Sequence, residues 1–326
     1  MSYDIIGDIH GHADHLKALL ANLGYHEIKG AWRHVDRRAL FVGDFIDVGP
    51  KQVETVEIVR RMVDAGTARA VLGNHELNAI AWFLCDPENP GDFLRSHFSP
   101  DWGAKNREQH EAFLAEVEHK PEHKEIIDWF LTLPLWLDLP EVRVVHACWH
   151  QRFMDYLAPM LLEGNRLDRD MMVHASREPA DSSEKDSPAP TIFKATEALT
   201  KGIEIPLPEG YSFQDKYNFT RNRMRVRWWD PKAVTYRNAA MLSLGLVEKL
   251  PDISIPEHRR VAYQGEKPLF VGHYWVTGAP APLSDKVACV DYSVAKGGKL
   301  VAYCWDGEDI LSASKFRFVE QVCTNG

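Results

Sequence analysis

Three short segments of the chain each end an apolar run with a glycine and side chains that bind metal ions: Gly7-Asp8-Ile9-His10, Gly43-Asp44-Phe45-Ile46-Asp47 and Gly73-Asn74-His75-Glu76. Asp8 and His10 are one residue apart, and alternate residues of an extended segment point to one side, so both could bind one ion. Asp44 has two carboxylate oxygens and could bridge two ions, and Asn74 offers a neutral oxygen. The ordered set, rather than any single segment, indicates a metal site.

Two histidines extend this pattern, because His146 and His273 each follow an apolar run directly. Both could supply an imidazole nitrogen to a second ion. A mixture of oxygen and nitrogen ligands suits Mn, Fe, Zn or Co better than a thiolate-selective site. In two-metal hydrolases the ions lie ~3.5–4 Å apart and share a hydroxide that attacks a phosphate ester in line. We therefore expect two divalent metal ions, with Mn as the leading candidate, and hydrolysis of a phosphate ester.

The hydrophobic pattern predicts alternating strands and helices in the first part of the chain. Apolar runs typical of buried strands occupy residues 3–6, 39–42, 68–72 and 142–145. Apolar residues at helical spacing predict helices over 13–23, 51–65 and 76–84. This rhythm favours an α/β fold with a largely parallel sheet, whose ligands lie at the carboxyl ends of the strands. We also expect an exposed amphipathic helix over 107–118.

The rest of the chain divides into two parts. Residues 151–260 include a polar stretch with three prolines over 177–190, which is typical of a mobile loop, and helical spacing at 191–200. We interpret 151–260 as an insertion or cap over the site. Strand-like runs then return at 269–271, 287–292, 299–305 and 316–322, with Gly297-Gly298 as a hairpin turn. The predicted core domain therefore comprises residues 1–150 and 261–326.

Composition limits the class of protein and its partners. The chain has 326 residues, 45% of them apolar, which is enough for one large domain or two ordinary ones. A net charge of -9 disfavours binding to nucleic acid or to an anionic membrane surface. The five cysteines form no CxxC pair, and no apolar run approaches the ~18 residues of a membrane span. We expect reduced thiols, a cytoplasmic location, and no secretory leader before the strand at Tyr3.

The three motifs resemble those of the calcineurin-like metallophosphoesterases, most closely the phosphoprotein-phosphatase branch and its bacterial relatives. The opening residues 3–11 are also similar to those of bacterial diadenosine tetraphosphatases. The resemblance covers about residues 3–150 and 268–305 and leaves 151–260 unassigned. It implies a four-layer αββα sandwich, in which two mixed sheets lie between outer layers of helices, with 151–260 as an inserted cap.

The resemblance also implies a role for each residue of the motifs. Asp8 and His10 would bind the first ion, and Asp44 would bridge both ions. The second ion would be bound by Asn74, His146 and His273. His75 matches the residue that protonates the leaving oxygen in this family, and Asp47 would orient it. A positioned imidazolium helps an alkoxide to leave, and a carboxylate on the far ring nitrogen fixes the tautomer.

The sequence departs from the family where phosphate is held. Phosphoprotein phosphatases usually carry an arginine after the second aspartate motif and another just before Gly-Asn-His-Glu, where this chain has Val48 and Leu72. Neither apolar side chain can form the bidentate hydrogen bonds of a guanidinium. Arg221 and Arg223 are the candidate replacements, because arginines alternate over 221–227 and would share one face of a strand. The alternative is a solvated edge strand whose charges deter aggregation.

The substrate is specified less closely than the metal site. A phosphomonoester, on a phosphoprotein or a small molecule, is the expected substrate. Hydrolysis of a dinucleoside polyphosphate is the alternative among enzymes, and a metal-binding scaffold without turnover is the alternative outside them. Trp149 and Trp275 lie close in sequence to predicted ligands. They could stack on an aryl group or a nucleobase, or they could simply fill the core.

Overall fold

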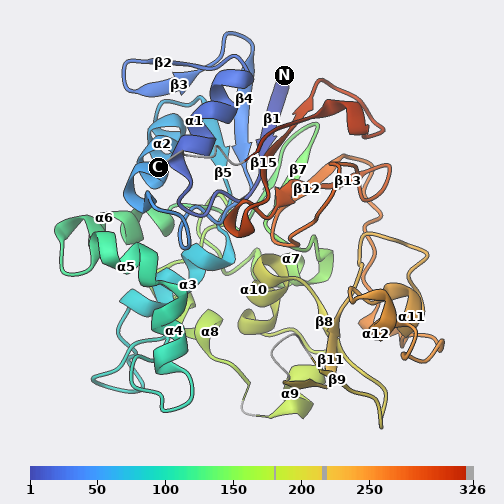
Figure 1. Cartoon of the computed structure of the whole chain (residues 1–326). Coiled ribbons are helices and arrows are strands. Elements are labelled where there is room, and N and C mark those ends of the chain that lie inside the picture. Colours follow the sequence, from blue (N-terminus) through green and yellow to red (C-terminus); the bar gives the residue numbers. More distant parts are fainter. Residues whose placement is uncertain (180, 215–218, 321–326) are drawn as a thin grey trace.

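A computed structural model of the chain, which describes residues 1–179, 181–214 and 219–320, contains two large mixed β-sheets (Figure 1). In the first sheet the strands lie in the order β14 (Asp291–Tyr292), β15 (Lys299–Trp305), β1 (Ser2–Ile6), β4 (Arg37–Phe41) and β5 (Ala68–Ala70). Strand β16 (Phe316–Val319) also pairs with β15. The second has the order β13-β12-β7-β6, with bounds Val287–Cys289, Leu269–Val271, Arg143–Val145 and Trp136–Asp138. The strands β1, β4 and β5 are parallel as expected, whereas β15 runs antiparallel to β1.

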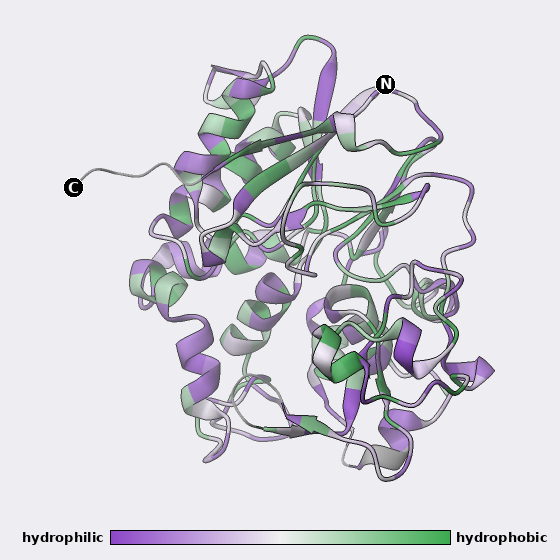
Figure 2. Ribbon diagram, turned by 45° about the vertical axis from the view of Figure 1, so that its right-hand side comes forward, coloured by the Kyte–Doolittle hydropathy of each residue, from purple (hydrophilic) through white to green (hydrophobic). Residues whose placement is uncertain are grey.

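The two sheets face each other across an apolar core, because alternate residues of a strand point to opposite faces. Ile5 and Val301 of the first sheet lie in one buried cluster with Val144 of the second. Ile6 and Phe41 belong to a different cluster, which also contains helix residues. Burial on both faces explains why these strands form continuous apolar runs in the sequence. Figure 2 shows hydrophobic strand segments in the interior and many hydrophilic segments in the surrounding helices.

Helices cover the outer faces of both sheets. Helices α1 (Ala13–Asn22) and α2 (Gln52–Asp64) share a buried cluster with the first sheet through Leu16, Leu19, Leu20, Val56, Val59 and Met62. Val145 and Val271 of the second sheet share the same cluster with Leu199 of α10 (Ile192–Lys201). The predicted α/β class and the four-layer αββα sandwich of two mixed sheets are therefore confirmed.

The other elements are short. Helix α3 (Asn74–Phe83) begins at the third motif; the remaining helices are α4 (Gly103–Gln109), α5 (Glu111–Val117), α6 (Pro121–Phe130), α7 (Gln151–Leu157), α8 (Arg169–Ser176), α9 (Ser182–Asp186), α11 (Tyr236–Ala239) and α12 (Leu244–Val247). Three small antiparallel pairs are β2 (His26–Ile28) with β3 (Ala31–Arg33), β8 (Glu204–Pro206) with β11 (Arg223–Arg225), and β9 (Phe213–Gln214) with β10 (Thr220–Arg221). In the described part of the chain, no helix has the length and apolar character that crossing a bilayer requires.

Residues 151–260 pack against the rest of the chain through buried contacts. The backbone N–H of Ala147 donates a hydrogen bond to the carbonyl oxygen of Leu199 at 2.8 Å. The indole N–H of Trp228 donates to the hydroxyl of Tyr274 at 2.7 Å. Leu199, Trp228 and Tyr274 all belong to the cluster that underlies α1 and α2. The predicted insertion therefore shares one hydrophobic core with the sheets.

Three predicted elements differ from the structure. The helix expected over 107–118 is interrupted at His110, so α4 and α5 are separate helices. The run 287–292 divides between the sheets, because β13 joins the second and β14 the first. The stretch 177–190, expected to be a mobile loop, contains the short helix α9. In each case contacts distant in sequence override the local pattern.

Candidate metal centre

The six predicted ligands converge where strands of both sheets end. Asp8 and His10 follow β1, Asp44 follows β4, and Asn74 begins α3 shortly after β5. The two histidines follow strands of the second sheet, β7 for His146 and β12 for His273. All six side chains are buried. Parallel strands place their carboxyl ends at one edge of a sheet, which is why residues so distant in sequence meet there.

Asp44 lies at the centre of two groups of potential ligands. Its Oδ2 atom is 3.2 Å from Nε2 of His146, 3.8 Å from Nε2 of His10 and 3.9 Å from Nε2 of His75. Ligand atoms within 4.8 Å of one another form one group from His10, Asp44 and His75, and another from Asp44, His146 and His273. A carboxylate that belongs to both groups occupies the position that a bridge between two ions requires.

Asp8 and Asn74 both contact histidines of the second group, which shares Asp44 with the first. Asp8 belongs to neither compact group, but its Oδ2 atom accepts a hydrogen bond from the backbone N–H of His273 at 2.9 Å. Oδ1 of Asn74 lies 2.7 Å from Nδ1 of His273 and 3.1 Å from Nε2 of His146. The structure therefore brings all six predicted ligands into one contiguous site.

The hydrogen bonds of two histidines direct a free nitrogen toward Asp44. Nδ1 of His10 is 2.9 Å from the carbonyl oxygen of Ile46, and Nδ1 of His146 is 2.7 Å from that of Val42. A carbonyl oxygen only accepts, so Nδ1 carries the proton in each ring and Nε2 can bind a metal ion. Burial, assisted by the charge of a neighbouring histidine, lowers the pKa of His10 to about 4. Its ring is therefore neutral at pH 7, as metal binding requires.

The electrostatics of the site fit bound divalent cations. Among the described residues, three buried atoms of the predicted ligands have no hydrogen-bond partner: Oδ1 of Asp8, Nε2 of His10 and Nε2 of His273. Unpaired buried polar atoms are rare in native proteins. Burial, together with the charges of Asp291 and Asp44, also raises the pKa of Asp8 well above its usual value. Two divalent cations would pair the free atoms and offset the repulsion between the carboxylates.

His75 lies on the exposed side of the site. Its side chain is 13% exposed, compared with 3% for His10 and 0% for His146. Nδ1 of His75 is 2.5 Å from Oδ2 of Asp47, while Nε2 faces Asp44. Burial alone would lower the pKa of His75, but the charge of Asp44 and the hydrogen bond to Asp47 raise it to about 9. The ring is therefore protonated near neutral pH and can act as a proton donor.

Asp47 has two further partners that the sequence patterns did not reveal. Nδ1 of His110 lies 2.9 Å from the same Oδ2 atom that faces His75. The backbone N–H of Asp47 donates to Oε1 of Gln52 at 2.6 Å. Burial disfavours a charged carboxylate, but the hydrogen bonds from His110 and His75 outweigh it and lower the pKa of Asp47. His110 lies at the break between α4 and α5, and no local sequence signal marks that break.

Glu76 joins the loops that follow β4 and β5. Its buried carboxylate accepts hydrogen bonds from the backbone N–H groups of Asp44 at 2.8 Å, Phe45 at 2.7 Å and Gly73 at 3.1 Å. Burial and the charge of Asp44 raise the pKa of Glu76 to about 7, and hydrogen bonds to its charged form are stronger than neutral ones. Glu76 therefore fixes the backbone that carries Asp44, and it does so without a position in either group of ligands.

We expect Glu76→Ala to lower the free energy of unfolding by about 3 kcal/mol, because it leaves buried backbone donors without a partner. Glu116 provides a matched control, since its half-buried carboxylate accepts from the backbone N–H groups of Gln52 and Val53. Glu116 accepts from two backbone donors at a helix start and is only half-buried, so Glu116→Ala should cost about 1 kcal/mol. Urea unfolding of both variants measures the difference. Equal losses would contradict a special role for Glu76.

The comparison with known proteins agrees with this geometry. The family model described as calcineurin-like phosphoesterase matches residues 1–181, more than half of the 326 residues. The chain belongs to the calcineurin-like phosphoesterase family. The predicted resemblance is therefore confirmed at the level of the family, and the family implies that divalent metal ions occupy the centre.

Several similar proteins of this family are bis(5'-nucleosyl)-tetraphosphatases PrpE from bacteria. The protein of Halalkalibacterium halodurans is 47% identical over 76 residues, which are 23% of this chain and 31% of the relative. That of Oceanobacillus iheyensis is 30% identical over 148 residues, which are 45% of this chain and 55% of the relative. The chain thus spans about half or less of the length of these relatives.

Solved structures of low identity cover most of the chain. A cold-active protein-tyrosine phosphatase of Shewanella sp. is 18% identical with a TM-score of 0.46, and the match covers 94% of this chain and 78% of that one. A protein serine/threonine phosphatase from Saccharomyces cerevisiae is 12% identical with a TM-score of 0.47, and the match covers 99% and 80%.

Within the calcineurin-like phosphoesterases, this chain lacks two arginines that phosphoprotein phosphatases usually carry. Leu72 is 1% exposed and packs in the main hydrophobic cluster. Val48 follows Asp47 and is 59% exposed, but its side chain has no hydrogen-bonding group. Neither side chain can donate a hydrogen bond to a phosphate oxygen.

The four arginines of 221–227 do not all lie on one face of a strand, so that expectation is wrong for Arg221, whereas Arg223 and Arg225 are alternate residues of β11. Arg221 belongs to β10 and Arg223 to β11, which are strands of different small sheets. Arg221 lies 5.8 Å from the ring centroid of Phe219. The guanidinium of Arg223 pairs with Asp186 and also donates to the carbonyl oxygen of Glu204 at 2.8 Å. The chain changes partner strand between the two residues, because β11 pairs with β8.

A third arginine of this segment, Arg225, contributes to the lowered pKa of a predicted ligand. Burial lowers the pKa of His273 well below its usual value, and the charge of Arg225 is the next largest cause. The Arg225 guanidinium lies 3.8 Å from Oε1 of Glu204, which is a weak pair. Among the described residues, Nε of Arg225 is buried without a hydrogen-bond partner. The charge of Arg225 therefore disfavours protonation of the predicted ligand His273.

The two tryptophans near the ligands have different surroundings. Trp149 is 4% exposed and lies in the hydrophobic core, with the guanidinium of Arg143 4.6 Å from its ring centroid. Trp275 is 45% exposed, so it does not fill the core. Asp291, which lies in the predicted strand run 287–292, is buried and accepts a hydrogen bond from the backbone N–H of Trp275 at 2.7 Å.

Proposed function

We propose that this protein is a two-metal phosphoesterase that hydrolyses a phosphomonoester, on a phosphoprotein or on a small molecule. The observation that carries the proposal is the shared position of Asp44 in two groups of ligands, with His75 on the exposed side. When bound, two divalent ions supply activation of water and neutralisation of the phosphate oxygens. The oxygen and nitrogen ligands favour Mn, with Fe, Zn or Co as alternatives.

The side chains of the site hold and deliver the proton that the leaving group needs. Asp47 binds Nδ1 of His75, so Nε2 points toward the region between the ligands. From there His75 can donate its proton to the departing oxygen. His110 provides a second hydrogen bond to Asp47 and helps to keep that carboxylate ionised. The three residues therefore form a connected chain from the buried interior to the leaving group.

Hydrolysis of a dinucleoside polyphosphate is the second candidate. The observation in its favour is the identity of the amino-terminal region to bis(5'-nucleosyl)-tetraphosphatases PrpE. Both reactions need attack of water on phosphorus between metal ions, so the same centre could serve either. They differ in what lies beyond the phosphate: a single alcohol in one case, and a nucleoside with further phosphates in the other.

A substrate panel tests the proposal: para-nitrophenyl phosphate, a phosphopeptide and diadenosine tetraphosphate, each with and without added Mn²⁺. Turnover is expected to depend on the metal, to stop on addition of a chelator and to return when Mn²⁺ is restored. The ratio of kcat/KM values between the phosphopeptide and the dinucleotide then separates the two candidates. If metal binds and none of the three compounds is hydrolysed, the protein is a metal-binding scaffold and the proposal fails.

Arginines of the insertion are proposed to hold the substrate phosphate. Arg221→Ala and Arg223→Ala are expected to raise KM for a phosphate ester several-fold, and Arg225→Ala about tenfold, because a hydrogen bond to a charged group contributes about 1.5–3 kcal/mol. Arg61→Ala is the control, since Arg61 is exposed on α2 and pairs with Glu57. An unchanged KM in all three variants and in the Arg221/Arg223 double variant would exclude this segment from phosphate binding.

A cytoplasmic location is proposed from the cysteines. Cys85, Cys148, Cys289 and Cys304 are free thiols in the structure, and Cys323 lies outside the described residues. Free, dispersed cysteines are typical of proteins in a reducing compartment. A phosphate-ester substrate is the only proposed partner. The net charge of -9 gives no reason to propose nucleic acid or an anionic membrane surface.

A further inference from the structure

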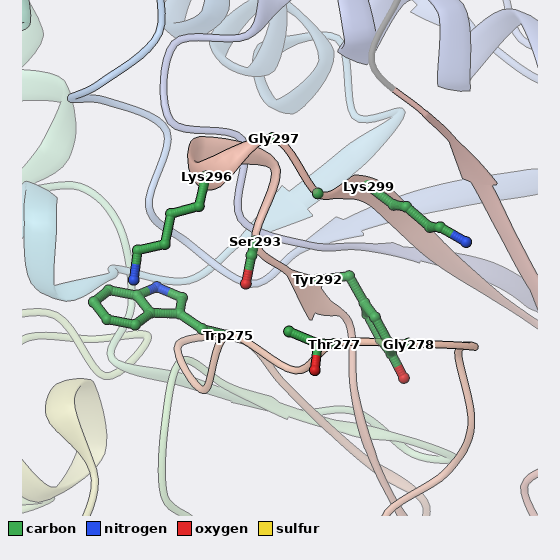
Figure 3. Close-up of a pocket in the computed structure, with 9 residues that line it drawn as sticks. Trp275, Thr277, Gly278, Tyr292, Ser293, Lys296, Gly297 and Lys299 are labelled. Carbon is green, nitrogen blue, oxygen red and sulfur yellow. The ribbon is translucent and has the colours of Figure 1, made fainter. Parts of the chain in front are cut away.

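A pocket of about 420 Å³ lies between the loop after β12 and the turn that joins β14 to β15 (Figure 3). Its lining includes an exposed indole, a tyrosine ring and two lysines: Trp275, Tyr292, Lys296 and Lys299. Small-molecule sites typically have volumes of about 300–1,000 Å³. These residues are separate from the predicted metal ligands, so the pocket is a distinct region of the molecule.

Asp291 accepts hydrogen bonds from two residues of this pocket, and one of them lies in the same loop as the predicted ligand His273. Its Oδ2 atom accepts from the backbone N–H of Trp275 at 2.7 Å, and its Oδ1 atom from that of Ser293 at 2.9 Å. Trp275 lies two residues after His273, whose own backbone N–H donates to Asp8 at 2.9 Å. The pocket and the metal centre therefore share one loop. A ligand with its reacting phosphate at the metals could extend along this loop into the pocket.

The backbone at the exposed Trp275 has a strained conformation. Trp275 has φ 48° and Ser293 φ 63°, values in the left-handed region that residues with side chains rarely adopt. The turn also requires glycine, because a Cβ at Gly298 would lie 2.1 Å from the carbonyl oxygen of Tyr292. Strained conformations of this kind persist where the surrounding structure imposes them, and they cluster at binding sites. An exposed indole held by such a backbone is suited to contact with a ligand.

The chemistry of the lining suits a flat ring that carries a negative charge. Nζ of Lys296 lies 2.9 Å from the ring centroid of Trp275, and Figure 3 shows this lysine reaching toward the indole beside Ser293. Lys299 lies near Glu320, at 3.3 Å, so much of its charge is already balanced. An ammonium beside an exposed indole is a local cationic and aromatic site on a chain with a net charge of -9.

We propose that this pocket binds the distal nucleoside phosphate of a dinucleoside polyphosphate whose reacting phosphate lies at the metal centre. The base would stack on Trp275, and Lys296 would contact a phosphate of the same arm. A phosphopeptide side chain offers neither a nucleobase nor a second phosphate, which is why the pocket favours the dinucleotide. The inference rests on the second candidate of the proposed function, hydrolysis of a dinucleoside polyphosphate, because it assigns the metal centre to one phosphate of the same molecule.

Binding of an uncleavable, methylene-bridged analogue of diadenosine tetraphosphate tests the inference by titration calorimetry on the full chain loaded with Mn²⁺. Trp275→Ala and Lys296→Gln are each expected to weaken Kd at least about fivefold, as loss of base stacking or of a phosphate contact does. Trp102→Ala and Lys105→Gln are matched controls, since Nζ of Lys105 lies 4.6 Å from the exposed ring of Trp102 outside the pocket. Both controls should bind the analogue as the unaltered protein does.

A second measurement separates this inference from the proposed function. Inorganic phosphate reports the metal centre, so its Kd should change less than that of the analogue in both pocket variants. Equal changes for both ligands, or wild-type affinity in Lys296→Gln and Trp275→Ala, would overturn the pocket. Turnover of para-nitrophenyl phosphate without any binding of the analogue would also overturn it and leave the phosphoesterase intact. Absence of Mn²⁺-dependent turnover, in contrast, would refute the proposed function itself.

Discussion

His75→Asn is expected to lower kcat by a factor of about 10²–10⁴, the range that loss of a general acid produces. The asparagine cannot protonate the leaving oxygen, whereas the six predicted ligands are all retained. The loss should depend on the leaving group. Nitrophenolate leaves readily without a proton, so para-nitrophenyl phosphate should suffer least, and an alkyl phosphate should suffer most. Steady-state kinetics with a series of phosphate esters of increasing leaving-group pKa measure this dependence.

The control for this result is metal content. His75→Asn should bind the same amount of Mn²⁺ as the unaltered chain, measured by elemental analysis of the dialysed protein. His26→Asn, in the exposed strand β2, should have unchanged kinetics. An equal loss for all leaving groups, or loss of metal together with activity, would show that His75 is a ligand, as its proximity to His10 and Asp44 allows.

Asp44→Asn is expected to remove both ions and to lower kcat/KM by more than about 10³-fold, since activated water and charge neutralisation are lost together. The reason is the position of Oδ2, which lies within 3.9 Å of Nε2 of three histidines and belongs to both groups of ligands. The amide is neutral and cannot replace a bridging carboxylate. Elemental analysis and kinetics on the same preparation test both parts of this prediction.

Two further variants serve as the comparison and the control for Asp44→Asn. His273→Ala removes a ligand that belongs to one group only, so it should lower the metal content by no more than one ion per chain. Asp64→Asn changes an exposed carboxylate on α2 and should affect neither metal nor activity. If Asp44→Asn retained two ions, or if His273→Ala lost both, the bridging assignment would be wrong.

The convergence of the six predicted ligands could be foreseen because each follows a strand or a glycine within a recognisable motif. Asp8, Asp44 and Asn74 lie in such motifs, and His146 and His273 end apolar runs. The strands themselves were predictable because burial on both faces leaves continuous apolar segments. The four-layer arrangement came from the resemblance of the motifs to a family, since hydrophobic pattern alone does not specify which strands share a sheet.

The supporting residues could not be predicted, because their positions depend on contacts distant in sequence. His110 reaches Asp47 from a break in a helical pattern, 63 residues away. Asp291 lies in an apolar run that divides between two sheets. Arg225 was grouped with Arg221 by simple alternation, but the chain changes partner strand between them. A periodic pattern describes the neighbours along the chain and contains no information on the element packed against it.

The buried contacts of the insertion have a consequence for access to the active site. A hinged lid would have to separate Trp228 from Tyr274 and Ala147 from Leu199 each time it opened. Such a movement would expose core side chains to water and would break both of these hydrogen bonds. Residues 151–260 are therefore held as a fixed part of the fold. We expect substrates to bind without closure of this segment around the bound molecule.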